Sequence, residues 1–169
     1  MRMELIQPFI NAADAVLAQC LRSTTRIEDL SMEEEVYRRR GIAAMITVNG
    51  DIEGRIIFDM EPHVALKVAC NSAGCELSDI DPSEADQVAG ETICEMANQV
   101  IGNAVTTLND QGYSFKVSPP NVHQDERGIP GSEDTEALVM CFSTAEGSFY
   151  MNIAMRYNRR RRGERTAAV

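Results

Sequence analysis

Apolar residues recur three and four positions apart near the start of the chain. This spacing places apolar side chains on one face of a helix and tolerates Pro8 only near the first turn. The pattern predicts an amphipathic helix over residues 3–22. The polar stretch that follows contains "MEEEVYRRR", which we interpret as a solvated connection or an exposed strand. The apolar positions of the helix are Leu5, Ile6, Phe9, Ile10, Ala13, Val16, Leu17 and Leu21.

Two later segments have the pattern of paired strands. "GIAAMITVNGDIEGRIIFDM" carries β-rich runs on both sides of Asn49-Gly50, which is a strong hairpin signal. "TEALVMCFSTAEGSFYMNIAMRYN" predicts a second hairpin that turns near Glu146-Gly147. Before it, "YSFKVSP" predicts a strand that Pro119-Pro120 stops, and "NVHQDERGIPGSED" predicts a polar loop.

Two further helices lie between the hairpins. "EPHVALKVACNSAG" predicts a short helix with Pro62 near its start and Gly74 at its C-terminal cap. A longer helix begins in "DPSEADQ", where Ser83 is the expected N-cap and Asp86 follows three residues on. We expect this helix to continue to about residue 110 and to end near Gly112.

The order of these elements predicts an α/β fold with a largely antiparallel sheet, because hairpins pair strands in opposite directions. Long helices would pack on that sheet, and no G-x-G-x-x-G or Walker-type loop indicates a nucleotide site. "EGRIIFDM" and "EGSFYMNIAM" both place Glu-Gly before an alternating strand, which suggests an internal duplication. With 169 residues we expect a single domain over 1–158 and a disordered Arg-rich tail over 159–169.

Composition and charge narrow the class of protein. Apolar content of 44% and charged content of 25% are typical of soluble globular proteins. No apolar run approaches the roughly 18 residues of a membrane helix, and the N-terminus lacks the features of a secretory signal, so we expect a cytoplasmic protein. The net charge of −10 is unfavourable for general contact with nucleic-acid phosphates, and we expect neither nucleic acid nor membrane as a partner.

The charge is unevenly distributed along the chain. The segment from Arg159 onward holds five arginines and one glutamate, a net +4, which leaves −14 on the remainder. A short basic run could bind nucleic acid or acidic lipid, but a solvated tail is the plainer interpretation. The five cysteines form no C-x-x-C pair, and no histidine stands at ligand spacing from them. We therefore expect buried, reduced thiols and no metal site.

The long helix predicted from residue 83 to residue 110 has two distinct faces. Glu91, Glu95, Asn98 and Gly102 are spaced four, three and four residues apart and form a line on the polar face. A solvated surface is the ordinary interpretation of such a line. Asn98 and Gly102, however, weaken the helix where packing does not require them, which often marks function. The expected buried face consists of Ala89, Ile93, Met96, Ala97, Val100, Ala104 and Leu108, whereas Glu84 and Asn109 join the polar face.

The chemistry available on this line is narrow. One carboxylate and one carboxamide a turn apart cannot form a nucleophile–base pair. A carboxamide can, however, hold a water molecule in line with a phosphoryl group, as glutamine does in small GTPases. A phosphorylated carboxylate and a metal ion would then have to come from a partner.

The segment "GETICEMANQVIGNAVTTL" resembles the E-x-x-N helix of the CheC/CheX/FliY phosphatases, which dephosphorylate the response regulator CheY. The resemblance covers roughly residues 5 to 157 and includes "INAADAVLAQCL", "ITVNGDIEGRIIFDMEPHVALKVACNSAG" and "SPPNV". It implies a CheC-like α/β sandwich. Because the first helix offers only Asn11 and Asp14, a single copy of the motif is present, as in the CheX branch.

The resemblance also implies roles for individual residues. Glu95 would pair with a receiver lysine, and Asn98 would enter the aspartyl-phosphate site and position water. Glu91, where the family usually has serine or aspartate, and Gly102 would lie in the receiver contact. The protein would be a homodimer with no cofactor of its own, and Mg²⁺ would be supplied by the response regulator. The alternative is a receiver-binding or scaffold module that uses the same fold without catalysing hydrolysis.

Overall fold

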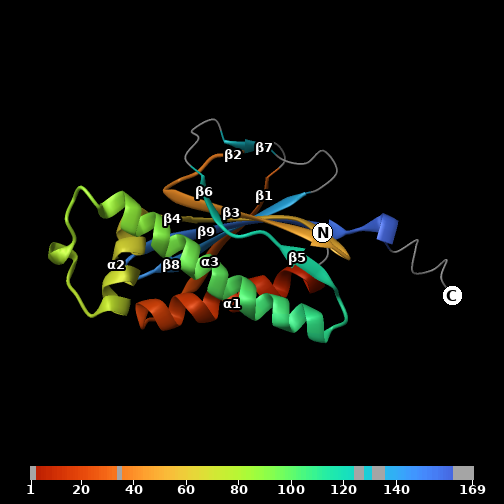
Figure 1. Cartoon of the computed structure of the whole chain (residues 1–169), viewed down its shortest axis with the longest axis horizontal. Coiled ribbons are helices and arrows are strands. Elements are labelled where there is room, and N and C mark those ends of the chain that lie inside the picture. Colours follow the sequence, from red (N-terminus) through yellow and green to blue (C-terminus); the bar gives the residue numbers. More distant parts are fainter. Residues whose placement is uncertain (1–2, 34–35, 124–127, 131–135, 162–169) are drawn as a thin grey trace.

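A computed structural model describes residues 3–33, 36–123, 128–130 and 136–161 (Figure 1). Three helices, a short 3-10 turn and nine strands alternate along these residues. In chain order they are α1 (Met3–Leu21), β1 (Arg26–Glu33), β2 (Val36–Tyr37), β3 (Ile42–Gly50), β4 (Ile52–Met60), α2 (Pro62–Ala73), η1 (Leu77–Asp79), α3 (Ala85–Asp110), β5 (Phe115–Val117), β6 (Asn121–His123), β7 (Ile129–Pro130), β8 (Ala137–Thr144) and β9 (Gly147–Tyr157).

Both predicted hairpins are confirmed, and they form the centre of one antiparallel sheet. Its strand order is β1-β8-β9-β4-β3-β5, with β6 also paired to β3. The two hairpins meet where β4 pairs with β9, from Ile52 opposite Tyr157 to Met60 opposite Phe149. The two segments that suggested an internal duplication therefore lie on adjacent central strands. The duplication itself stays a prediction.

The molecule is layered, with α1, α2 and α3 covering one face of the sheet and the small β2–β7 ribbon lying beyond the other face (Figure 1). The main core lies under the helices, and all seven residues expected on the buried face of the long helix belong to it. A second, smaller apolar cluster packs beneath the ribbon and consists of Tyr37, Ala43, Ile57, Ile129 and Val139. The predicted α/β fold with an antiparallel sheet and packed helices is thereby confirmed.

Helix boundaries agree with the sequence in most places. The first helix begins and ends within a residue of its predicted range, and α2 ends at Gly74, whose φ of 70° and ψ of 31° are left-handed. The polar stretch after α1 begins as an edge strand, β1, which pairs with β8. Of "MEEEVYRRR", Met32 and Glu33 end β1, and residues 34–35 lie outside the described residues. Val36–Tyr37 form β2 with Tyr37 buried, so the exposed-strand alternative holds only in part. Gly112 follows α3 with a φ of 92°.

The expected N-cap of α3 is wrong. Glu84 occupies that position without a side-chain cap, because Ser83 is engaged one turn earlier. The backbone N–H and the hydroxyl of Ser83 both donate to Asp81 Oδ1, at 3.0 and 2.9 Å. These bonds hold the pKa of the Asp81 carboxyl below its usual value. A local turn has therefore replaced the predicted cap.

Two predictions about strands also need correction. The first hairpin turns one residue later than expected, at residue 51, because Asn49 and Gly50 still belong to β3 and pair with β5. A Cβ at Gly50 would lie 2.4 Å from Phe115 Cα, so this position needs glycine for close strand contact. The predicted polar loop after the proline pair begins as a strand, β6, and also contains β7; residues 124–127 and 131–134 of that loop lie outside the described residues.

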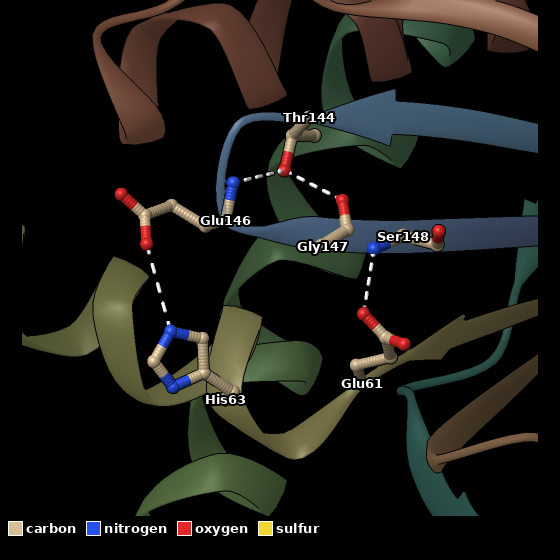
Figure 2. Close-up of polar contacts among 6 residues, drawn as sticks. All are labelled: Glu61, His63, Thr144, Glu146, Gly147 and Ser148. Carbon is tan, nitrogen blue, oxygen red and sulfur yellow. Dashed lines mark hydrogen bonds and ion pairs between the residues drawn. The ribbon is translucent and has the colours of Figure 1, made fainter.

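The turn of the second hairpin is attached to the start of α2 (Figure 2). The backbone N–H of Ser148 donates to Glu61 Oε2 at 2.8 Å, and His63 Nε2 lies 3.5 Å from Glu146 Oε2. Within the turn, Thr144 Oγ1 accepts from the N–H of Glu146 at 3.2 Å. These contacts join α2, which follows the first hairpin, to the second hairpin.

The cysteines and the chain end differ in part from expectation. None of the five cysteines is in a disulfide, but only Cys70 is buried, and Cys20, Cys75, Cys94 and Cys141 are half-buried. Residues 159–161 of the predicted tail are helical, and residues 162–169 lie outside the described part. No helix among the described residues is long and apolar enough to span a membrane.

Candidate functional site

Helix α3 is a rigid support for the predicted site. It has 26 residues and is therefore about 39 Å long. It packs against α1, α2 and the first hairpin, so its inner face is held along most of its length. Because those contacts involve fully apolar side chains, the outer face is presented in a fixed orientation (Figure 1).

The predicted line of residues lies on that outer face. Glu91, Glu95, Asn98 and Gly102 are all exposed, while Met96, Ala97 and Val100, which alternate with them along the chain, are buried. The helical spacing predicted from the sequence is therefore confirmed, and the four positions follow one another along the surface of α3.

The two central side chains are unengaged within the molecule. In the described part of the chain, the side chains of Glu95 and Asn98 make no hydrogen bond or ion pair. Glu91 differs, because Gln87 Nε2 donates to Glu91 Oε1 at 3.0 Å one turn earlier. Sequence reasoning missed Gln87, although its spacing of four from Glu91 could have indicated the contact. Glu95 and Asn98 are thus the members of the line that are available to another molecule.

The surface around Gly102 is open. A Cβ at this position would meet no atom within 4 Å, so internal packing does not require glycine here. Its carbonyl accepts a hydrogen bond from Thr106 Oγ1 at 2.9 Å, a contact that any residue at 102 could accept. The absence of a side chain matters only to something that approaches the helix from outside.

A shallow groove of about 370 Å³ runs beside the line, between α1 and the C-terminal half of α3. Amide and hydroxyl side chains contribute to its lining from both sides: Gln7 and Asn11 on α1, Asn103 and Thr107 on α3, and Gln111 just after α3. The sequence reasoning did not find this groove. Polar residues spaced four apart on both helices carry its signal, but only the packing of α1 on α3 brings them together.

The first helix, α1, carries Asn11 and Asp14, the two polar residues that do not form a second copy of the E-x-x-N motif. There, Asn11 Oδ1 accepts a hydrogen bond from Gln7 Nε2 at 2.9 Å. The carboxylate of Asp14 accepts a hydrogen bond from the Thr25 hydroxyl, which lies just after the helix. Both groups of α1 therefore already take part in a hydrogen bond within the chain.

The chemistry of the α3 surface is limited to what one carboxylate and one carboxamide can do. Among the described residues, no three His, Cys, Asp or Glu side chains are grouped so that they could hold a metal ion. Glu95 and Asn98 project from a convex helix and not into a cavity of this chain. They can accept hydrogen bonds, pair with a cation or orient a water molecule, but only inside a site that a partner provides.

Comparison with known proteins gives one family match and several structural matches. The family model described as "Chemotaxis phosphatase CheX" matches residues 42–143, which contain the whole line on α3. A CheX from Borrelia burgdorferi, solved in complex with CheY, BeF3 and Mg²⁺, is 32% identical with a TM-score of 0.69. That match covers 92% of this chain and 99% of the other.

More distant structures share the fold. A CheC-like superfamily protein from Shewanella sp. PV-4 has 21% identity and a TM-score of 0.76, covering 92% of this chain and 99% of that one. CheX from Vibrio vulnificus has 20% identity and a TM-score of 0.74, covering 90% and 99%. Comparison with curated protein sequences gives no significant match.

Proposed function

This chain belongs to the CheX family of chemotaxis phosphatases, and on that premise we propose that it hydrolyses the aspartyl-phosphate of a CheY-like response regulator. The observation that carries the proposal is the pair of exposed side chains on α3, Glu95 and Asn98, which have no partner within the described chain. The two side chains lie one turn apart on a helix whose other face is buried. They can therefore enter a receiver together.

In this proposal Asn98 positions the attacking water. Its carboxamide oxygen accepts a hydrogen bond from the water, whose oxygen then attacks the phosphorus in line with the aspartyl oxygen. The bond between phosphorus and that oxygen breaks, inorganic phosphate leaves, and the receiver carboxylate is regenerated. Orientation of water by a single amide is an established contribution to phosphoryl transfer.

Glu95 fixes the position of α3 on the receiver. Its carboxylate pairs with a lysine beside the aspartyl-phosphate and so sets the depth to which Asn98 enters. Glu91 lies one turn away, where its bond from Gln87 at 3.0 Å keeps it on the rim of the contact. Gly102 lies one turn beyond Asn98, and its missing side chain allows the receiver surface to approach the helix backbone.

The divalent cation belongs to the receiver. The described residues of this chain offer no group of metal ligands, and the related Borrelia burgdorferi protein was solved together with CheY, BeF3 and Mg²⁺. Mg²⁺ would neutralise charge on the phosphoryl oxygens, while this chain contributes only the amide and the carboxylate. The protein acts where its receiver is located, which we predict to be the cytoplasm.

The decay rate of phosphorylated receivers from the same genome tests the proposal. Each receiver is phosphorylated with a small-molecule donor in Mg²⁺, the donor is removed, and the remaining aspartyl-phosphate is followed with and without this protein. We expect substoichiometric protein to accelerate the decay of at least one receiver. A receiver that binds tightly but decays at its own rate would instead identify a binding module without catalysis.

We also propose that the protein is a homodimer that associates through β1. This strand is at the edge of the sheet, and Ile27, Leu30 and Met32 on it are 46%, 56% and 49% exposed. They pair with Phe142, Met140 and Leu138, which belong to the helix-covered core. The apolar face of the sheet thus extends at β1 beyond its helices, and edge pairing with a second copy would cover it.

Sedimentation measurements test the dimer. Leu30→Lys places a charge in the middle of the apolar strip and should shift the protein towards monomer at micromolar concentration. Met3→Lys is the matched control, because Met3 is 45% exposed but lies on α1 and not on the edge strand. A monomeric wild-type protein, or equal association of both variants, would contradict an interface at β1.

A further inference from the structure

The end of helix α2 brings two cysteines together. Gly74 caps the helix in a left-handed conformation, and its N–H donates to the carbonyl of Cys70. The N–H of Cys75 donates to the same carbonyl at 3.1 Å. The second bond is the 6→1 bond of a Schellman motif, in which the residue after the glycine lies close to the residue five positions earlier. Here both residues are cysteines.

The geometry of this motif suits a disulfide. Neither thiol is in a disulfide, and the Cys75 side chain lies close enough to Cys70 to help raise the pKa of the Cys70 thiol. A disulfide needs Cα atoms about 4.4–6.8 Å apart, a separation compatible with the 3.1 Å hydrogen bond from the Cys75 N–H to the Cys70 carbonyl. The helix cap therefore provides the alignment that two cysteines at this spacing would otherwise lack.

The two thiols differ in how easily an oxidant can reach them. Cys70 is 1% exposed, whereas Cys75 is half-exposed and lies outside the helix. Burial raises the pKa of the Cys70 thiol, and its contact with the Cys75 side chain raises that pKa further. Cys75 is therefore the thiol that an oxidant reaches first, and Cys70 lies beside it as the second thiol of a disulfide.

We propose that Cys70 and Cys75 form a reversible intramolecular disulfide when the protein meets a hydroperoxide. The Cys75 thiolate attacks one peroxide oxygen, the O–O bond breaks, and Cys75 becomes a sulfenic acid with release of water from hydrogen peroxide. The Cys70 sulfur then attacks the Cys75 sulfur, the S–O bond breaks, and a second water leaves. Two thiols are oxidised, one peroxide is reduced, and a dithiol reductant reverses the change.

The crosslink would connect the end of α2 to the segment that leads into α3. That segment contains η1, where Glu76 N–H donates to Asp79 Oδ2 at 2.9 Å, and it continues to the first turn of the helix that carries Glu95 and Asn98. The modification does not depend on the proposed hydrolysis, and each can be tested without the other.

The test treats the full-length, reduced protein with hydrogen peroxide, unfolds it in denaturant so that the buried Cys70 thiol is accessible, and then alkylates the remaining thiols. Proteolysis on the N-terminal side of aspartate releases a fragment of residues 59–78, which contains Cys70 and Cys75 but no other cysteine. We expect this fragment to lose the mass of two hydrogens and to resist alkylation. Dithiothreitol should restore the original mass and the alkylation of both cysteines. Cys20 and Cys94 should still be alkylated, because burial raises the pKa of both thiols and so slows their reaction with peroxide. Full alkylation of the 59–78 fragment after peroxide would overturn the proposal.

Variants separate the roles of the two thiols. Cys70→Ala should accumulate a sulfenic acid at Cys75 that dimedone traps, whereas Cys75→Ser should leave Cys70 unoxidised. Cys141→Ser is the control and should form the disulfide as the wild type does. Because Cys75 is half-exposed, its variant is expected to fold, so oxidation of Cys70 in Cys75→Ser at the wild-type rate would contradict the assigned order.

Discussion

Helices α1 and α3 lie against each other on the same face of the sheet, yet their outward polar groups are in different states. On α1, Asn11 accepts a bond from Gln7, and Asp14 accepts one from Thr25. On α3, the side chains of Glu95 and Asn98 have no partner in the part of the chain that the structure describes. The two helices therefore offer the same kinds of group, but only α3 leaves them available.

This difference bears on how a functional surface is recognised. A carboxylate or amide that is already bonded has fewer sites to offer a partner, and exchanging that bond for another gives little net free energy. An unengaged group on a rigid helix gives up only its water. The α3 surface also accepts Asn98 and Gly102, both weak helix formers, without any packing reason. The contrast between the helices is thus stronger evidence for function than the exposure of α3 alone.

The largest expected effect follows from removing the amide of α3. Asn98→Ala should lower the rate of receiver dephosphorylation by about 10²–10³, because one positioned hydrogen-bonding group is lost at the reacting centre. Affinity for the receiver should stay close to that of the wild type. The measurement is single-turnover decay at saturating protein.

The control for this prediction lies on the other helix. Asn11→Ala removes the same side chain from α1, where it is bonded to Gln7, and should leave the decay rate unchanged. Equal losses in both variants would mean that the two helices do not differ in function. A wild-type rate for Asn98→Ala would exclude the proposed role in orienting water.

Charge reversal at Glu95 should produce the next largest effect, on binding. Truncating one member of a buried charge pair typically costs roughly 2–5 kcal/mol, and Glu95→Lys would place a cation against the receiver lysine. We expect at least about tenfold weaker binding, which is 1.4 kcal/mol, with little change in melting temperature. Titration against a receiver that carries a phosphoryl mimic measures the change in affinity.

A matched reversal on the same helix shows whether position or overall charge matters. Asp110→Lys changes the charge equally at the exposed last residue of α3, about 22 Å from Glu95, and should bind the receiver as the wild type does. If Glu95→Lys retains full affinity, the line on α3 is an ordinary solvated face. If both variants lose affinity equally, the effect is one of net charge.

Substitutions at Gly102 should have smaller effects, raising the stability of the fold while weakening receiver binding. Gly102→Ala should raise the free energy of unfolding by about 0.5–1 kcal/mol, because the new Cβ meets nothing within 4 Å and alanine favours the helix. Gly102→Gln should keep part of that gain but weaken receiver binding, by less than Glu95→Lys does, since its long side chain occupies the approach to the backbone. Denaturant unfolding and the receiver titration measure the two effects. Unchanged binding by Gly102→Gln would remove Gly102 from the contact.

The smallest functional effect is expected on α1. Asp14→Ala loses the hydrogen bond from Thr25 and should lower the free energy of unfolding by about 1 kcal/mol, without changing receiver binding or decay. Thr25→Val is the complementary variant and should have a similar effect on stability. A loss of phosphatase rate in Asp14→Ala that exceeds its loss of stability would show that α1 also contacts the receiver.

Local patterns in the sequence were enough for most of the fold. The three- and four-residue spacing in α1 and α3 and the alternation in both hairpins are short-range properties that sterics and apolar burial translate directly into helices and strands. Gly74 was predictable for the same reason, since few other residues adopt the left-handed cap. One error arose from a local turn and the other from a distant segment. Asp81 engages Ser83, and the edge of β3 recruits residues 121–123 into a strand.

The sequence by itself determined which residues share the outer face of α3, because helical periodicity alone places Glu91, Glu95, Asn98 and Gly102 in line. Helical spacing also accounts for the bond to Asn11, which comes from Gln7 four residues earlier on the same helix. Folding beyond the helix decided the state of other polar groups, because the partner of Asp14 is Thr25, which only the turn after α1 brings beside it. The groove between α1 and α3 arises in the same way, from two faces that are unremarkable separately. Periodicity is a property of one segment, whereas hydrogen-bond satisfaction also depends on the rest of the fold.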